Sequence, residues 1–217
     1  MKQTKIQGVF KDRNQIYTEN FAPKTKVYNE KIVKYKNKEY RSWNPYRSKL
    51  AAAILNGSDF KIEPKTNVLY LGAATGTTVS HISDILENGT VYAVENSAIA
   101  FKKLLEVCKK RTNIIPIFEN ANHPEKYSFI VPKVNLVYQD ISQRNQAEIF
   151  TKNVGKYLKK DGFAILMVKA RSIDVSLKPK AAYDLVQKTL EENNFKIKSQ
   201  IELAPYEKDH AAIFIKG

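Results

Sequence analysis

From residue 67 onward, short apolar runs alternate with longer segments in which apolar positions recur with a helical period. The apolar runs are too short for helices and are typical of buried strands in a parallel sheet. Such strands separated by amphipathic helices indicate an α/β fold with a doubly wound sheet. The expected strands are 67–71, 90–95, 114–118, 134–139 and 163–169, and the expected helices are 77–87, 97–111, 143–160 and 178–194.

Both ends of the chain depart from this alternation. VFKDRNQIYTEN and KIVKYKNKEYRSW are typical of hairpins that turn near Arg13–Asn14 and Asn37–Lys38. Residues 1–43 are therefore expected to form a small N-terminal β domain, which Trp43 packs onto the remaining domain, residues 44–217. Near the C-terminus, FKIKSQIEL and HAAIFIKG have no helix between them, so we expect an antiparallel pair at the edge of the sheet.

One more helix is expected in NPYRSKLAAAILNG, ahead of the alternating region. Asn44 is suited to cap its start, Pro45 to its first turn and Gly57 to its end. Lys49 lies at the edge of its apolar stripe, where small alanine neighbours would leave the amine partly desolvated. The stripe consists of Tyr46, Leu50, Ala53 and Ile54.

Composition narrows the class of protein. Lys and Arg outnumber Asp and Glu by 36 to 22, and the net charge of +14 suits either a polyanionic partner or plain solubility. No apolar run is long enough for a membrane helix, and the N-terminus lacks a signal-peptide core, so a cytoplasmic location without membrane contact is expected. The single cysteine, Cys108, excludes an internal disulfide. His81 and His123 stand without a cluster of further ligands, and no metal site is expected.

The glycine-rich turn after the first strand of the sheet predicts a ligand site. A strand, such a turn and a helix form a pocket where backbone N–H groups face a ligand. The turn does not match G-x-G-x-x-G, because Ala74 and Thr77 replace the second and third glycines, and no Gly-Lys-Ser/Thr of a P-loop follows. A pyrophosphate is poorly served, so the expected occupant is S-adenosylmethionine, whose amino-acid end can lie against the turn.

Polar residues follow the next three strands of the expected sheet. Glu95 ends the second strand, where a carboxylate can accept hydrogen bonds from both ribose hydroxyls of a cofactor. Asn120 and Ala121 follow the third strand, at the depth of an adenine, and Asp140 follows the fourth. Because the carboxyl ends of parallel strands share one edge, these residues predict a single cofactor crevice.

The segments YLGAATGTTVSH, VYAVE, VPKVNLVYQDISQ, VKARSIDV and PYEKDHAAI resemble the fibrillarin family in its short archaeal form, from about Val27 to the C-terminus. The resemblance implies a class I S-adenosylmethionine-dependent methyltransferase sheet, which is Rossmann-like, with a small N-terminal β domain. It also implies methylation of ribose 2′-hydroxyls in rRNA and tRNA by the catalytic subunit of the box C/D guide ribonucleoprotein.

The resemblance assigns cofactor contacts around the crevice. Two positions depart from the family pattern: Asn120 stands where an Asp is common, and Asn96 stands where an aromatic or apolar residue often follows the ribose-binding acid. Asn120 can still accept a hydrogen bond from an adenine amino group, though without charge. The expected contacts are Gly72, Ala73, Thr77, Thr78, Glu95, Asn96, Asn120, Ala121, Asp140, Ile141, Ser142 and Gln143.

Four residues are candidates for catalysis: Lys49, Asp140, Lys169 and His210. The last three lie at strand ends, Lys49 comes from the preceding helix, and the resemblance places a Lys-Asp-Lys-His tetrad on these same positions. Lys169 is the expected general base. Lys49 would supply a neighbouring positive charge, Asp140 would orient Lys169, and His210 would hold substrate or pass on the proton.

The resemblance also implies partners: a box C/D guide RNA, the target rRNA or tRNA, a Nop-type scaffold protein and a kink-turn-binding ribosomal protein. The apolar and aromatic surface around the N-terminal module and first helices is the candidate docking face. Two other classes compete with the methyltransferase. One is a catalytically silent module of the same fold that binds RNA or protein, and the other is an NAD-dependent oxidoreductase, which the failed G-x-G-x-x-G motif disfavours.

Overall fold

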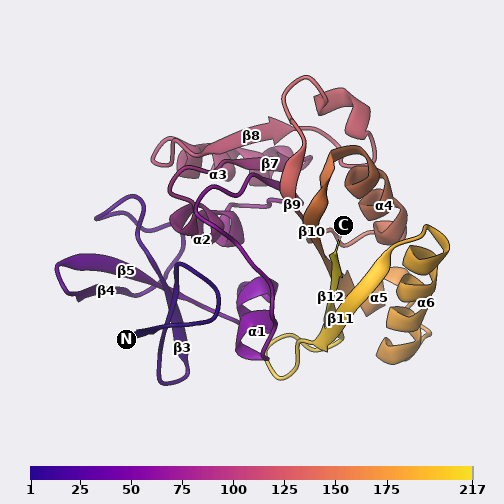
Figure 1. Ribbon diagram of the computed structural model, residues 1–217, viewed down its shortest axis with the longest axis horizontal. Helices are drawn as coiled ribbons and strands as arrows, with labels where there is room; N and C mark the ends of the chain where they lie inside the picture. The colour runs from indigo at the N-terminus through magenta and orange to yellow at the C-terminus, as the bar shows by residue number, and fades with distance from the viewer. Residues whose placement is uncertain (217) are drawn as a thin grey trace.

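The computed structural model describes residues 1–216, which form two β-sheets and the helices that cover the larger one (Figure 1). The smaller sheet is antiparallel, with the strand order β1-β2-β3-β5-β4. Both predicted hairpins are confirmed, although the second turns at Lys36–Asn37, one residue earlier than expected. Both of these residues have positive φ, as a two-residue hairpin turn of the primed type requires. The strands are β1 (Lys2–Gln3), β2 (Val9–Asp12), β3 (Gln15–Glu19), β4 (Ile32–Tyr35) and β5 (Lys38–Trp43).

The larger sheet has seven strands in the order β11-β12-β10-β9-β6-β7-β8. All five predicted parallel strands and the C-terminal antiparallel pair are confirmed. The chain runs outward from β6 to β8 on one side and from β9 to β12 on the other, so the order reverses between β6 and β9. The strands are β6 (Val68–Leu71), β7 (Val91–Glu95), β8 (Ile114–Phe118), β9 (Val134–Gln139), β10 (Leu158–Lys169), β11 (Lys196–Glu202) and β12 (His210–Lys216).

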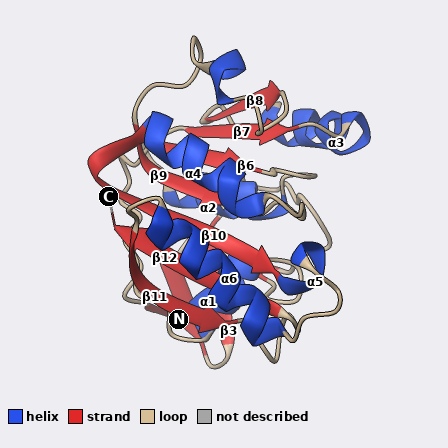
Figure 2. Ribbon diagram, turned by 90° about the vertical axis from the view of Figure 1, so that its right-hand side faces the viewer, coloured by secondary structure: helices blue, strands red, loops and turns tan. Residues whose placement is uncertain are grey.

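Helices cover both faces of this sheet. On one face lie α1 (Lys49–Leu55), α2 (Thr77–Ile85) and α3 (Ala98–Cys108). The opposite face carries α4 (Gln146–Tyr157) and α6 (Pro179–Glu192), which lie in front of the strands in Figure 2. The short helices η1 (Pro124–Tyr127) and α5 (Ala170–Ile173) complete the set. None of the helices within residues 1–216 is both long and apolar enough to cross a membrane.

The start of α1 differs from the prediction. The helix begins at Lys49 with Ser48 as its N-cap, and not at Asn44–Pro45. The Asn44 side chain is used locally, since its Oδ1 accepts a hydrogen bond from the backbone N–H of Tyr46 at 2.9 Å. Tyr46 consequently lies outside the helix and is exposed, so its place in the apolar stripe was wrong.

The end of α4 was also predicted wrongly, because Leu158 already begins β10. The C-terminal end of α1 was predicted correctly. Gly57 follows the cap residue Asn56 with φ of +91°, the left-handed conformation that commonly ends a helix.

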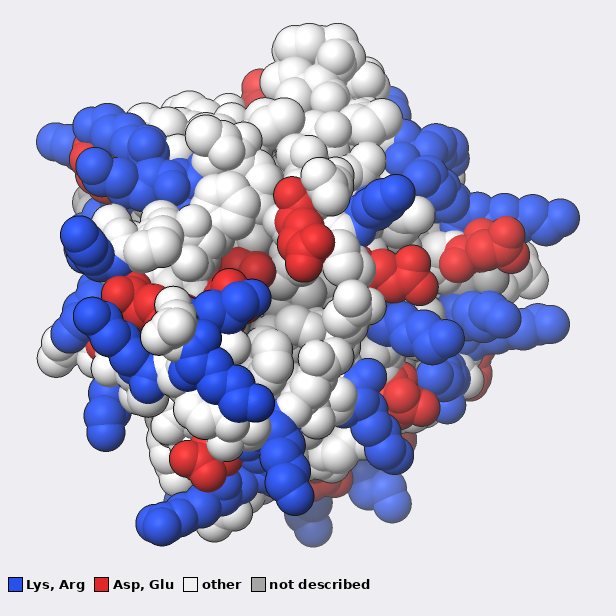
Figure 3. Space-filling model, turned by 60° about the vertical axis from the view of Figure 1, so that its left-hand side comes forward, with Lys and Arg blue, Asp and Glu red and all other residues white. Residues whose placement is uncertain are grey.

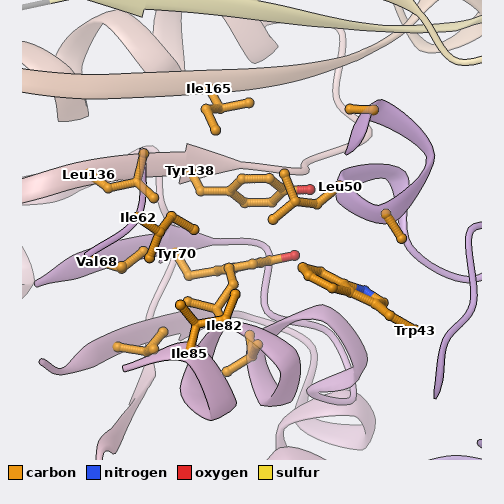
Figure 4. Packing of buried hydrophobic residues seen from close by; sticks show 14 of the residues in the cluster. Trp43, Leu50, Ile62, Val68, Tyr70, Ile82, Ile85, Leu136, Tyr138 and Ile165 are labelled. Atoms are coloured by element: carbon orange, nitrogen blue, oxygen red, sulfur yellow. The ribbon is translucent and has the colours of Figure 1, made fainter. Parts of the chain in front are cut away.

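Side-chain alternation along the strands divides the core into two layers. Val68 and Tyr70 of β6 face α1 to α3, whereas Leu69 and Leu71 face α4 and α6. Trp43, at the end of the N-terminal sheet, enters the first layer and is fully buried beside Tyr70 (Figure 4). The smaller sheet therefore shares the core of the larger one, and Trp43 packs the two together as predicted.

A buried polar cluster joins the two sheets at α2. Asp84 accepts four hydrogen bonds, from the Thr18 hydroxyl, the Phe21 backbone N–H and the guanidinium groups of Arg41 and Arg111. The side chains of Asp84 and Arg41 are fully buried, and that of Arg111 is 1% exposed. Because Arg41 comes from β5 and Asp84 from α2, this cluster fixes the N-terminal sheet to the helix that follows the glycine-rich turn.

His81 completes the cluster as a structural residue. Its ring stacks on Trp43 with the centroids 4.8 Å apart, and its nitrogens lie 2.7 Å from the hydroxyls of Thr18 and Tyr28. Burial, followed by the positive charges of Arg41 and Arg111, lowers the pKa of His81 well below its ordinary value. A neutral ring can donate to one hydroxyl and accept from the other, which satisfies both nitrogens.

Replacing Asp84 with Asn should destabilise the protein by about 3–5 kcal/mol, because it leaves two buried guanidinium groups with too little negative charge. Urea unfolding measures this change. The matched control is Glu106→Gln, which removes an exposed carboxylate that pairs with Lys109 and should change the free energy of unfolding by no more than about 0.5 kcal/mol. Similar small losses in both variants would contradict the role given to Asp84.

Candidate functional site

The candidate site lies at the carboxyl ends of the parallel strands, where the order of the sheet reverses between β6 and β9. In open α/β sheets this switch point leaves a crevice for a ligand, since the connections on either side lead to opposite faces. The glycine-rich turn, residues 72–76, occupies this point and leads directly into α2. It is also where the predicted cofactor and catalytic residues converge.

The backbone N–H groups of the turn point mainly into the protein. Those of Gly72 and Ala73 both donate to the carbonyl oxygen of Val94 at 3.0 Å, and that of Ala74 donates to Glu95 Oε2 at 2.8 Å. The turn thus lacks the set of free N–H groups with which a dinucleotide or P-loop turn holds phosphates. This geometry agrees with the expectation of a ligand that has no pyrophosphate.

Gly72 makes the closest backbone contact of the site. Its φ is +82°, and a Cβ built on it would lie 2.3 Å from the carbonyl oxygen of Asp140. The N–H of Asp140 in turn donates to the carbonyl of Leu71 at 2.9 Å. A glycine is therefore required at position 72 if the ends of β6 and β9 are to stay together. The backbone of the turn thus comes close to the end of β9, in addition to any ligand in the crevice.

A crevice opens beside this contact, and seven of the twelve predicted cofactor residues line it: Gly72, Glu95, Asn96, Asn120, Ala121, Ile141 and Gln143. The carboxylate of Glu95 accepts hydrogen bonds from Ala74 N–H and Ser97 N–H, which hold it at the end of β7. A carboxylate has further lone pairs, so Glu95 can also accept from two ribose hydroxyls. The helix α2 has no side-chain cap, which leaves N–H groups at its start for a ligand carboxylate.

The other predicted cofactor positions lie around the crevice. Ala73 and Thr78 are buried, Thr77 and Asp140 are partly exposed, and Ser142 is exposed. The Thr78 hydroxyl donates to Ser48 Oγ at 2.9 Å, so it ties the start of α1 to α2. The residues present fit S-adenosylmethionine: a carboxylate for the ribose, apolar walls for the adenine and an uncapped helix for the carboxylate.

Asn120 is held by its own loop. Its Oδ1 accepts from the backbone N–H of Asn122 at 2.9 Å and from the Asn122 side chain at 3.1 Å. Asn122 also donates to Gln143 Oε1 at 3.1 Å, and Asn145 donates to Asn122 Oδ1 at 2.9 Å. These amides join the loops after β8 and β9 into one rim of the crevice. The direct bond from an adenine amino group to Asn120 remains a prediction.

Lys49 and Asp140 form an ion pair across the mouth of the site. The Lys49 amine donates to both carboxylate oxygens of Asp140, at 2.8 and 3.0 Å, and both side chains are about one fifth exposed. Lys49 thus reaches from the first turn of α1 to the end of β9. This differs from the expected contact between Asp140 and Lys169, because the carboxylate is engaged by Lys49.

Lys169 and His210 lie opposite each other at the ends of β10 and β12, where they are paired in the antiparallel register. Both are partly buried. Among residues 1–216, nothing forms a hydrogen bond or ion pair with the Lys169 amine. His210 Nδ1 lies 2.6 Å from the Lys208 carbonyl, to which it donates, so in the neutral ring Nε2 is left to accept a proton.

Gln146 is a positioning residue that the sequence did not reveal. It is fully buried at the start of α4, where its Oε1 accepts from Lys169 N–H at 3.3 Å. Its backbone carbonyl accepts from the Gln139 side chain at 2.6 Å, just before Asp140. One residue therefore links the strand ends that carry Asp140 and Lys169. A glutamine at a helix start carries no sequence signal for this, since only the packed strands bring its partners near.

The four catalytic candidates thus share one edge with the cofactor crevice. Lys49 and Asp140 balance each other's charge, whereas the Lys169 amine and His210 Nε2 are available for a substrate proton. The arrangement suits transfer to a weakly acidic hydroxyl, which needs a positioned acceptor for its proton.

The comparisons with known proteins agree with this geometry. The fibrillarin family model matches residues 1–217. The fibrillarin-like rRNA/tRNA 2′-O-methyltransferase of Methanothermobacter thermautotrophicus is 45% identical over 212 residues, which cover 97% of this chain and 95% of that protein.

Two solved structures are also similar to this chain. Aeropyrum pernix fibrillarin in complex with natively bound S-adenosyl-L-methionine superposes with a TM-score of 0.89 at 40% identity, covering 99% of this chain and 96% of that chain. A fibrillarin/Nop5p complex gives a TM-score of 0.91 at 44% identity, covering 100% and 99%.

Gly72→Ala should weaken binding of S-adenosylmethionine at least about tenfold by calorimetry, because the new Cβ would push Asp140 and the crevice apart. Gly57→Ala is the control. Gly57 also has a positive φ, but a Cβ there meets nothing within 4 Å. It should cost about 1 kcal/mol of stability and leave binding unchanged. Equal effects of the two substitutions on binding would show that the contact with Asp140 does not shape the crevice.

Proposed function

The chain belongs to the fibrillarin family, and we propose that it transfers the methyl group of S-adenosylmethionine to ribose 2′-hydroxyls of ribosomal and transfer RNA. The observation that carries this proposal is the Lys49–Asp140 pair, with Lys169 and His210 at the same sheet edge. The fold is that of class I methyltransferases, with an added antiparallel sheet at the N-terminus. The cofactor follows from the similarity to the fibrillarin that binds it.

The cofactor supplies a methyl group on a positively charged sulfur, which leaves as a neutral thioether. The chain's own residues have to orient the ribose and take its proton. Lys169 Nζ is the proposed acceptor, since it lies at the site edge without a partner in the described residues. The proton leaves the 2′-oxygen as the oxygen–carbon bond forms and the carbon–sulfur bond breaks. General-base catalysis of this kind contributes about 10²–10⁴-fold.

The other three residues have supporting roles in this proposal. Asp140 holds the Lys49 ammonium group at the mouth of the site, where this group can bind a ribose hydroxyl or a phosphate. The carboxylate also balances the positive charge of Lys49 when no substrate is bound. His210 Nε2 can accept the proton in a second step and pass it to solvent. Gln146 fixes the backbone of Lys169 relative to Asp140.

The proposed setting is a guide ribonucleoprotein in the cytoplasm. The similarity to the fibrillarin of the Nop5p complex supports a Nop-type scaffold as partner. The finer proposal adds a box C/D guide RNA and a kink-turn-binding ribosomal protein. It rests on the absence of any RNA-reading motif in the sequence, which has no RNP signature and no KH loop. Base pairing to a guide would supply the specificity that the protein lacks.

Lys169→Ala should reduce methyl transfer below about a tenth of the wild-type rate while leaving cofactor affinity unchanged, because the base acts only on the hydroxyl. Lys169→Arg should fail as well, since a guanidinium does not lose its proton near neutral pH. Labelled methyl transfer and calorimetry measure the two effects. Lys160→Ala, an exposed lysine at the other end of β10, is the control. An active Lys169→Ala would assign the base elsewhere.

The purified chain alone should methylate no specific RNA, because its charge attracts RNA without reading sequence. The test mixes the chain, labelled cofactor and target RNA, and adds guide RNA and scaffold protein stepwise, with the product nucleotide mapped. We expect site-specific methylated RNA only in the mixtures that contain both the guide RNA and the scaffold protein. Site-specific methylation by the chain alone would contradict the proposal that a guide RNA supplies the specificity. If no mixture yields methylated RNA, the catalytically silent module would be favoured instead.

A further inference from the structure

A groove with basic side chains runs along the junction of the N-terminal sheet and α3. It has a volume of about 580 Å³. Three separate segments supply its cations: Lys26 from loop 20–31, Arg47 from the segment before α1, and Lys103 and Lys110 from α3 and its end. All four side chains are exposed. In the view of Figure 3, which brings the left-hand side of Figure 1 forward, Lys and Arg side chains also predominate over Asp and Glu.

The charges of the groove are not neutralised within the described part of the chain. Lys26, Arg47, Lys103 and Lys110 form no ion pair with any carboxylate of residues 1–216. The one acidic residue that lines the groove, Glu106, is engaged by Lys109 at 2.7 Å. Positive charge held on two walls of a hollow raises the local concentration of polyanions and favours their binding.

The groove continues into a second hollow of about 540 Å³, since Tyr28, Asn29 and Arg47 line both. At the far end Tyr46 is 64% exposed, and its ring lies edge-on to Tyr206 with the centroids 5.3 Å apart. An exposed aromatic ring held by a second one is a surface on which an unpaired nucleobase can stack.

Two residues on this path are close in sequence to residues of the active site. Thr75 lines the groove and belongs to the glycine-rich turn, three residues after Gly72. Arg47 lies two residues before Lys49, whose amine binds Asp140. The groove is therefore connected to the site through the glycine-rich turn and the segment that leads into α1.

We propose that this groove binds the phosphate backbone of the single-stranded target RNA that continues beyond the guide–target duplex, with one of its bases stacked on Tyr46. This rests on the proposed function and extends it, because it gives the N-terminal sheet a direct part in holding RNA through Lys26. Cations on separate walls along a path fit an extended polyanion better than a compact phosphate. The stacking surface at the end of the path fits a strand with unpaired bases.

The salt dependence of RNA binding tests the phosphate contacts. Fluorescence anisotropy of the whole chain with a labelled short single-stranded RNA is measured over a range of salt. The double substitution Lys103→Ala/Lys110→Ala should lower the slope of log affinity against log salt by about 1.4, since each phosphate contact contributes about 0.7. Lys102→Ala/Lys180→Ala removes the same charge from α3 and α6 outside the groove, and should change the slope far less. Equal slopes in both double variants would overturn the proposal.

Substitutions at Tyr46 test the stacked base. Tyr46→Ala should weaken binding about tenfold, and Tyr46→Phe should preserve it, because stacking requires the ring but not the hydroxyl. If both behave alike, no base stacks there and that part of the proposal is wrong.

Methyl transfer in the reconstituted complex separates the groove from the chemistry. The groove double variant should raise the KM for RNA and leave kcat at saturating RNA and cofactor affinity unchanged, since neither lysine belongs to the catalytic set. If RNA binding depends on the groove but no complex transfers methyl, the groove stands and the proposed function fails. If transfer occurs with an unchanged KM in the groove variant, the function stands and the groove is refuted.

Discussion

The site depends on one backbone contact, the approach of Gly72 to the carbonyl oxygen of Asp140. No side chain fits between them, so β6 and β9 end side by side and their continuations separate to opposite faces of the sheet. The turn that follows β6 shapes the cofactor crevice, and the residue that follows β9 holds Lys49. A single steric constraint therefore sets both the shape of the cofactor crevice and the position of the Lys49–Asp140 pair.

Much of this architecture could be predicted, because local patterns determine it. Val68 to Leu71 could only be a short buried strand, and Glu95 and Asp140 follow strands whose carboxyl ends must meet. Local competition explains the error at α1. Asn44 and Ser48 both resemble helix caps, and the bond from Tyr46 N–H to Asn44 favours Ser48. The Lys49–Asp140 pair joins residues 91 positions apart, which no periodicity encodes.

Buried and exposed charged side chains have different roles in this protein. Inside, the carboxylates of Asp84 and Glu30 compensate the guanidinium groups of Arg41 and Arg111, so four charged side chains are buried at the junction of the sheets. Outside, the cations of the groove beside this junction remain free for a partner. Arg111 also lines that groove, but its side chain is almost fully buried and its charge is paired with Asp84. The junction that stabilises the fold thus also supports the surface that we propose binds RNA.

The N-terminal sheet is synthesised before the segments against which it packs. Its strands leave the ribosome before those of the larger sheet, but Arg41 pairs with Asp84 on α2, and Asp84 in turn also binds Arg111 after α3. Arg111 follows Arg41 by 70 residues, which at about 5–20 residues per second takes roughly 4–14 s. Trp43 likewise enters the core only after Tyr70 and His81 have been made, and until then the open edges of β1 and β4 can pair with other chains. The N-terminal sheet is therefore made before the segments that complete its folding, so its edge strands stay open for as long as those segments take to be synthesised.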